Sequence, residues 1–229
     1  DRFFKPFLQQ ELNADLLELE KKRIPACLEE ACEKYAVSAE RLSGTERLAF
    51  DLLPVLVEKS VHLDITLLRK GHTIELLALE EPLSASLNER LSIEGKVDRI
   101  DRLDGVVRVI DYKTGNIGSL GIMEAEQLTD GEHAAAFQLM IYALMAQSSF
   151  PDEVFNACIY LTKEWSKGPK NLSFGEKKEK TFLIGADRIL EFREQLIDLI
   201  EEILDPQADF VHLELPEESE DESREKEER

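Results

Sequence analysis

The sequence has few cysteines, and it has no long apolar run. Its three cysteines, Cys27, Cys32 and Cys158, are odd in number and match neither a disulfide framework nor a metal site. The simpler interpretation is that they are buried thiols in a reducing cytoplasm. The absence of long apolar runs excludes a transmembrane helix, and no basic segment followed by an apolar one marks a signal peptide. We therefore expect a cytoplasmic protein without a membrane partner.

Positive charge is also scarce, with 28 Lys and Arg against 48 Asp and Glu, a net charge of −20. This total opposes nucleic-acid binding, which Lys and Arg drive, but the charges are unevenly distributed. Residues 214–229 hold nine acids and three bases, so we expect residues 213–229 to be an acidic disordered tail. Residues 163–180 hold six lysines against three glutamates. This basic loop, which includes Trp165 and Phe174, either holds DNA through phosphates and stacking or is a solvated hairpin.

Hydrophobic residues make up 43% of the 229 positions, which is enough for a sizeable core. We expect residues 1–212 to form one domain. Apolar residues recur at helical spacing in residues 1–36 and 46–68, which predicts a helical portion over residues 1–72, with Pro25 as a kink or break. The chain opens on Asp1, and we expect it to be a piece of a longer protein.

The pattern changes at Thr73, where residues 73–212 are expected to form an α/β core. Asp104-Gly105 is a strong hairpin signal between two of the predicted strands. Pro82 fits the end or the edge of the first strand. We predict strands over residues 73–83, 90–101 and 106–113, a helix over 133–148, a strand from 154 and a closing helix over 185–204.

Three side chains with potential chemistry meet in this core. Side chains alternate along a strand, so Asp111 and Lys113 point to the same face, and Asp98 comes from the preceding strand of the hairpin. Two neighbouring carboxylates repel each other unless a cation neutralises them, and Mg²⁺ is the natural cation for oxygen ligands. The backbone carbonyl of Tyr112 is a further candidate ligand. A lysine beside the metal can orient water and stabilise developing charge.

A simpler alternative applies to the same segment. Asp98, Arg99, Asp101 and Arg102 can form surface ion pairs, and Lys113 can be the solvated end of a strand. A lone acid and lysine in this spacing would favour that interpretation, and only a larger set of residues argues against it.

The larger set consists of three segments in order, "GKVDRID", "GVVRVIDYKTG" and "QLMIY", between residues 95 and 142. Together they resemble the motifs of RecB-type nucleases in the PD-(D/E)xK superfamily. More narrowly, they are similar to the C-terminal nuclease domain of AddB-like helicase–exonuclease subunits of bacterial double-strand-break repair. The resemblance implies a restriction-endonuclease-like core, a central mixed sheet flanked by helices, with a helical N-terminal portion.

The same resemblance implies roles for individual residues. Asp98 and Asp111 match the metal-binding acids of the family, and Lys113 matches its catalytic lysine. Gln138 and Tyr142 match the glutamine and tyrosine of the downstream helix, where a spacing of four places them on one face. The alternative is that Gln138 and Tyr142 have no role in a site and simply lie beside the apolar face of the helix.

Glu80 matches the upstream acid of the family, although Glu81 is an alternative.

The chain also departs from the family pattern in two ways. The family's first motif, a helix of the form G-T-x-x-H-x-x-L-E, matches none of the four histidines, and we expect that histidine to lie upstream of Asp1. Many relatives bind an iron–sulfur cluster through four cysteines. Three scattered cysteines cannot supply these ligands, so no cluster is expected.

The resulting hypothesis is a metal-dependent DNA nuclease domain, an exonuclease rather than an endonuclease, that uses Mg²⁺ or, in its place, Mn²⁺. The resemblance implies DNA as the substrate and, as partner, a helicase–nuclease subunit or a helicase-like region of the same parent chain. The alternative is a non-catalytic nuclease-like module that binds DNA or acts as a scaffold. The two acids and the lysine favour catalysis, because a scaffold has no physical need to crowd two carboxylates.

Overall fold

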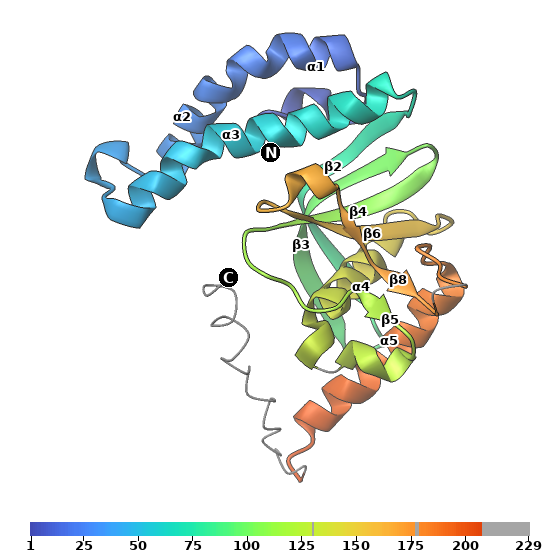
Figure 1. Ribbon diagram of the computed structural model, residues 1–229. Helices are drawn as coiled ribbons and strands as arrows, with labels where there is room; N and C mark the ends of the chain where they lie inside the picture. The colour runs from blue at the N-terminus through green and yellow to red at the C-terminus, as the bar shows by residue number, and fades with distance from the viewer. Residues whose placement is uncertain (130, 177–178, 208–229) are drawn as a thin grey trace, which may run out of the picture.

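A computed structural model of the chain describes residues 1–129, 131–176 and 179–207. These residues form three layers, in which a mixed sheet lies between an N-terminal helical layer and two C-terminal helices (Figure 1). The expected acidic tail at residues 213–229 lies outside the described residues.

The N-terminal helical layer rests on the first strands of the sheet. Its core contains Phe3, Phe7, Leu17, Val61 and Ile65, which pack against the start of the second strand. Pro25 lies in the first turn of a helix, a position that tolerates proline because the missing amide proton would have no partner there. The layer consists of α1 (Ala14–Glu20), α2 (Ile24–Lys34) and α3 (Gly44–Arg69), with short 3-10 turns η1 (Lys5–Phe7), η2 (Lys21–Arg23) and η3 (Ala39–Arg41).

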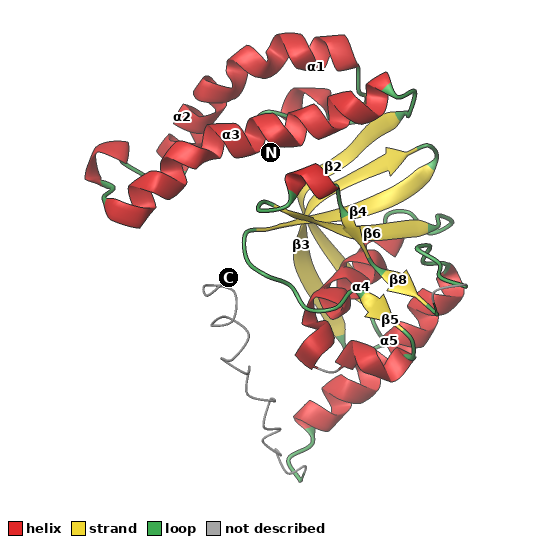
Figure 2. Cartoon of the chain, viewed as in Figure 1, coloured by secondary structure: helices red, strands yellow, loops and turns green. Residues whose placement is uncertain are grey.

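The six-stranded sheet has the order β1-β2-β3-β4-β6-β7 (Figure 2). Strands β4 and β6 pair in parallel, and the other neighbours are antiparallel. The carboxyl ends of β4 and β6 therefore lie at the same edge of the sheet. The strands are β1 (Gln10–Glu11), β2 (Ile74–Ser86), β3 (Ser92–Leu103), β4 (Val106–Lys113), β6 (Phe155–Leu161) and β7 (Lys170–Asn171).

A tight hairpin sets the register of β3 against β4. Asp104 and Gly105 both have positive φ, 49° and 88°, as a two-residue turn of type I′ requires. Leu103 pairs with Val106, and the ladder continues to the pair formed by Arg99 and Ile110. The hairpin signal in the sequence is thus confirmed, and it fixes which residues of the two strands face each other.

The other side of the sheet is covered by α4 (Ala134–Gln147) and α5 (Ala186–Leu204). Helix α4 is apolar on nearly all sides because it is buried between the sheet and α5. Gly95 of β3 allows this approach, since a Cβ there would come within 2.9 Å of the Met145 methyl group. A small parallel sheet, β5 (Gly121–Ile122) and β8 (Ser173–Phe174), and the 3-10 turns η4 (Ala125–Thr129), η5 (Gly131–His133) and η6 (Trp165–Lys167) complete the described residues.

The predicted α/β architecture is confirmed, and two details are corrected. Residues 1–36 are not helical throughout, because Gln10–Glu11 adds strand β1 to the edge of β2. Strand β2 continues past Pro82 to Ser86. Pro82 is tolerated because β1 pairs only with Glu75 and Leu76, so β2 is an edge strand at the proline.

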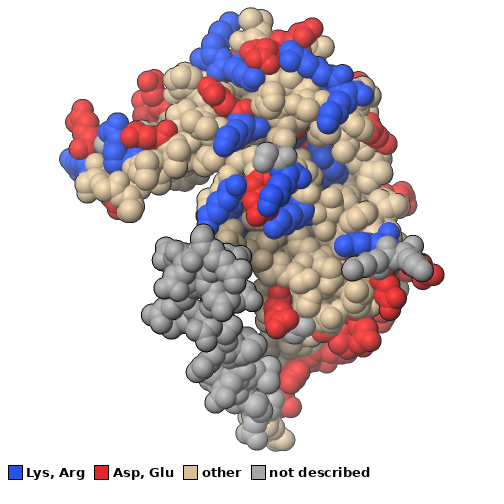
Figure 3. Space-filling model, in the orientation of Figure 1, with Lys and Arg blue, Asp and Glu red and all other residues tan. Residues whose placement is uncertain are grey.

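Charge is distributed unevenly over the surface. On the face shown in Figure 3, Lys and Arg side chains gather at the centre of the view, Lys and Arg are mixed with Asp and Glu over the N-terminal helices, and Asp and Glu side chains gather along α5.

Candidate active site

The two acids of the predicted site are cross-strand neighbours. Arg99 pairs with Ile110, so the register places Asp98 of β3 opposite Asp111 of β4. Residues opposite each other in antiparallel strands carry their side chains on the same face, about 5 Å apart at Cβ. The backbone amide of Tyr112 donates a hydrogen bond to Asp98 Oδ2 at 3.0 Å, which holds this carboxylate against β4.

One carboxylate oxygen of Asp111 accepts no hydrogen bond. The side chain is buried, and this oxygen is Oδ2. The ammonium of Lys113 lies 3.1 Å from this oxygen as an ion pair that is not aligned for a hydrogen bond. A buried carboxylate oxygen without a donor is the environment that a hard cation fits, and Mg²⁺ is often held by one or two carboxylates with water completing its shell.

A short hydrogen-bond chain connects the lysine to helix α4. Lys113 Nζ donates to Gln138 Oε1 at 2.8 Å, and Gln138 Nε2 donates to Tyr142 Oη at 2.6 Å. The predicted helix pair thus faces the strand pair, with Gln138 between lysine and tyrosine. The structure brings together five of the predicted residues: Asp98, Asp111, Lys113, Gln138 and Tyr142.

Burial and crowding shift the ionisation of these groups. Burial is the main cause that raises the pKa of Asp98, and the negative charges of Asp111 and Glu80 raise it further, although the Tyr112 amide opposes the shift. Burial likewise raises the pKa of the Tyr142 phenol. Asp98 therefore resists carrying its negative charge in the absence of a cation, which is what two crowded carboxylates predict.

The upstream acid, Glu80, is placed differently. It lies between Leu79 and Glu81, which pair with Arg99 and Val97, so it stands opposite Asp98 on the next strand. Its φ of 51° is in the left-handed region, and its carboxylate forms an ion pair with Lys96. Within residues 1–129, 131–176 and 179–207, no group of three or more His, Cys, Asp or Glu is arranged to hold a metal. The role of Glu80 as the upstream acid therefore stays a prediction. The same holds for the alternative, Glu81, which is exposed.

A buried ionic network lies next to Asp98 in the sequence. Arg99 Nη1 donates to Asp64 Oδ2 of α3 at 2.7 Å, and Arg99 Nε donates to Asp101 Oδ2 at 2.9 Å. Arg108 of β4 donates to both oxygens of Asp101, at 2.7 and 2.9 Å. The exposed fractions of Arg99 and Asp101 are 2% and 0%, so their interpretation as surface ion pairs is wrong.

This network is the part of the site region that the sequence interpretation missed. Burial raises the pKa of Asp64. For Asp101 burial acts in the same direction, but the charges and hydrogen bonds of Arg99 and Arg108 prevail and lower its pKa. Asp64 gave no signal because it lies in a predicted helix, 35 residues from its partner. By contrast, Arg102 pairs with Glu75 and Glu153 near the surface, as an ordinary ion pair would.

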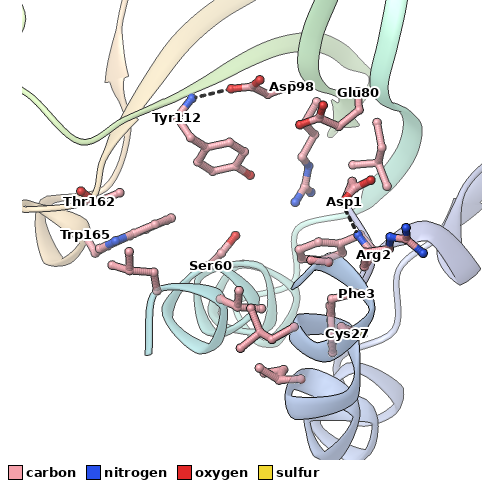
Figure 4. A pocket seen from close by; sticks show the side chains of 18 residues that line it. Asp1, Arg2, Phe3, Cys27, Ser60, Glu80, Asp98, Tyr112, Thr162 and Trp165 are labelled. Carbon is pink, nitrogen blue, oxygen red and sulfur yellow. Dashed lines mark hydrogen bonds between the residues drawn. The ribbon is translucent and has the colours of Figure 1, made fainter. Parts of the chain in front are cut away.

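A cavity of about 280 Å³ opens beside Asp98, between the sheet and the N-terminal helices (Figure 4). Tyr112, Trp165 and Ser60 line part of it, and the rest of the lining comes from residues 1–4, from apolar residues of α2 and α3, and from β2 and β3, including Glu80 and Arg99. Burial raises the pKa of the Tyr112 phenol, and a hydrogen bond with Ser60 opposes this shift. The cavity places aromatic and hydroxyl groups near the candidate metal ligands.

The aromatic residues of the basic loop are not available for stacking on DNA. Trp165 is buried, and its ring stacks on Tyr160 at 5.7 Å between centroids. Phe174 is also buried, and the guanidinium of Arg188 covers its ring. The expectation that these two rings stack on bases is therefore wrong, and the lysines of this loop remain candidates for DNA contacts.

The mixed sheet carries two opposed acids and has a lysine at the carboxyl end of a strand with a parallel neighbour, which is the arrangement expected of a nuclease built on an α/β core. Comparison of the sequence with known families gives the same answer. Residues 2–215 match the PD-(D/E)XK nuclease superfamily, and the chain belongs to this superfamily. A search of curated proteins found no match.

Proposed function

We propose that the chain is a metal-dependent DNA nuclease domain that hydrolyses phosphodiester bonds. The observation that carries this proposal is the opposition of Asp98 and Asp111 across the β3–β4 hairpin, with the Lys113 ammonium 3.1 Å from Asp111. Membership of the superfamily supports nuclease activity and the use of divalent metal.

The metal ligands would be Asp98, Asp111 and the backbone carbonyl of Tyr112. Mg²⁺ is the expected ion, and Mn²⁺ is a substitute that takes the same oxygen ligands. When bound, such an ion polarises a phosphoryl oxygen and lowers the pKa of a water nucleophile. The orphaned Oδ2 of Asp111 supports this assignment, because a cation would satisfy it.

The protein's own groups prepare the reaction. The Tyr112 amide fixes the orientation of Asp98, and Gln138 accepts a hydrogen bond from Lys113. This bond holds the Lys113 ammonium beside Asp111, where it can orient the attacking water and stabilise negative charge that develops on the phosphate. Tyr142 holds Gln138 in turn, so that the lysine keeps one geometry.

The wider context is also part of the proposal. The three ordered motifs support a helicase–exonuclease protein of DNA repair and recombination, with a helicase partner subunit or a helicase-like region of the same parent chain. Exonuclease action and a cytoplasmic location belong to the same proposal. Cys27 and Cys32 lie on α2 and Cys158 on β6, all three unpaired, which supports a reducing compartment. No iron–sulfur cluster is proposed. Among the described residues, no helix is both long and apolar enough to cross a membrane.

Cleavage assays test the proposal directly. Linear single- and double-stranded DNA is incubated with the chain and Mg²⁺ or Mn²⁺, beside Asp111→Ala and Lys113→Ala. We expect metal-dependent cleavage that falls at least 100-fold in both variants, since each removes a group of the reacting centre. Asp104→Asn, in the hairpin turn away from the site, is the matched control and should cleave like the wild type.

Two results would count against catalysis. If the wild-type chain binds DNA, but neither it nor a version extended at the N-terminus to include the motif histidine cuts the DNA with either ion, the nuclease proposal fails and the non-catalytic module replaces it. If cleavage persists undiminished in Asp111→Ala, the activity does not come from this site.

A further inference from the structure

We propose that Lys163, Lys167 and Lys170 form a phosphate-binding surface, which holds the backbone of a DNA strand at the edge of the candidate active site. The inference rests on the proposed function, because it names the surface that presents the substrate to Asp98, Asp111 and Lys113. The three lysines are exposed. They are called the lysine turn below.

The lysine turn lies next to the carboxyl end of β4, which carries Lys113. Strands β4 and β6 run in parallel, and Lys113 pairs with Leu161 at their carboxyl ends. The backbone amide of Thr162 donates to the Lys113 carbonyl at 2.9 Å, and Lys163 follows directly. The chain therefore passes directly from the end of β6, beside Lys113, into the lysine turn.

The turn is anchored rather than loosely attached. The Trp165 ring is buried and stacks on Tyr160, and it also contacts the ring of Tyr112, whose amide holds Asp98. Figure 4 shows Trp165 and Thr162 on the same side of the cavity as Tyr112, with Asp98 nearby. Within the turn, the amide of Gly168 donates to the Trp165 carbonyl at 3.1 Å. A fixed backbone lowers the conformational entropy lost when the lysines meet a ligand.

The charges of the turn favour an anion. Lys167 and Lys170 share one acid, each with its ammonium 3.3 Å from Glu164 Oε2. Their hydrogen bonds lower the pKa of Glu164, so the acid stays ionised and offsets one of the three positive charges. Figure 3 shows basic side chains around an acidic centre on this face. In a chain with a net charge of −20, a positive surface beside the site is where phosphates bind with least repulsion.

The salt dependence of DNA binding tests this surface. Affinity for a fluorescently labelled oligothymidine is measured by anisotropy between 50 and 200 mM salt, with chelator so that no cleavage occurs. The triple variant Lys163→Gln, Lys167→Gln and Lys170→Gln should bind at least 10-fold more weakly at the lowest salt. Its slope of log affinity against log salt should be shallower by about 2, since each phosphate contact to a single strand contributes about 0.7.

The matched control carries Lys22→Gln, Lys34→Gln and Lys70→Gln, three exposed lysines of the N-terminal helical portion. It should keep the wild-type slope. Equal slopes for the lysine-turn variant and the wild type, or equal losses in both triple variants, would overturn the inference.

Cleavage is scored separately, so the two proposals can fail independently. If binding depends on the lysine turn, but neither the chain nor its N-terminally extended version cuts DNA with Mg²⁺ or Mn²⁺, the surface stands and the catalytic proposal fails. If the chain cuts DNA while its binding slope is unaffected by the turn, only the surface fails.

Discussion

Lys113 at the end of β4 donates a hydrogen bond of 2.8 Å to the side-chain carbonyl of Gln138 on α4. The partner of this lysine therefore comes from a helix on the face of the sheet, and not from a neighbouring strand. A lysine side chain has four rotatable bonds. With the ion pair to Asp111 alone, the Lys113 ammonium could therefore occupy several positions. The glutamine reduces these positions to the one beside the buried acid.

This relationship predicts a positioning role for Gln138. In Gln138→Ala, the rate of DNA cleavage at saturating DNA should fall about 10- to 100-fold, as is usual when a residue that orients a site group is removed. The affinity for DNA should stay unchanged, because the glutamine acts through Lys113. Single-turnover cleavage and anisotropy provide the two readouts.

Gln147→Ala, at the last residue of the same helix, is the control for this change. Its cleavage rate should match that of the wild type. An equal cleavage rate in Gln138→Ala and the wild type would show that Lys113 does not need the glutamine.

The buried ionic network predicts a large effect on stability. Arg99→Met leaves Asp64 and Asp101 buried without their shared cation, and breaking a buried ion pair costs about 3–5 kcal/mol. Arg102→Met, three positions along the same strand, removes only partly exposed ion pairs and should cost less than about 1 kcal/mol. Urea unfolding followed by circular dichroism measures both. Similar losses in the two variants would contradict the central place of Arg99.

The crowding of Asp98 predicts an unusual acid titration. Burial first, and then Asp111 and Glu80, raise the pKa of Asp98, so its carboxylate takes up a proton at higher pH than an exposed aspartate, whose pKa is about 3.9. A divalent ion needs the ionised carboxylate. As the pH is lowered, metal affinity should therefore begin to fall at a higher pH than the pKa of an exposed aspartate would predict. In Asp111→Asn the like charge is gone, and the pKa of Asp98 should decrease.

Carboxyl ¹³C NMR of the metal-free protein measures this titration in both forms. The account of crowding fails if Asp98 titrates like an exposed aspartate in the wild type, or if its pKa does not decrease in Asp111→Asn.

The sequence predicted the strand pair of the site because two strong local rules apply there. Alternation along a strand places Asp111 and Lys113 together, and the Asp104-Gly105 turn fixes Asp98 opposite Asp111. The spacing of Gln138 and Tyr142 followed from the helical repeat. These arrangements depend on residues close in the chain, so local patterns are sufficient.

Other features depend on distant contacts and had no local signal. Arg99 is buried because Asp64 of α3 approaches it, and the periodicity of β3 alone does not reveal that partner. Trp165 is buried by Tyr160 and Tyr112, although its neighbours in the sequence, Glu164 and Ser166, are polar. Strand β1 has only two residues, too few for a periodic pattern.

The most direct test of the central claim is the position of Mn²⁺ in crystals of the chain soaked at saturating concentration. We predict an anomalous-scattering peak between Asp98 and Asp111, within bonding distance of one oxygen of each carboxylate and absent in Asp111→Asn. Manganese bound elsewhere, with Asp98 and Asp111 free of it at saturation, would contradict the assignment of this hairpin as the metal site of a nuclease.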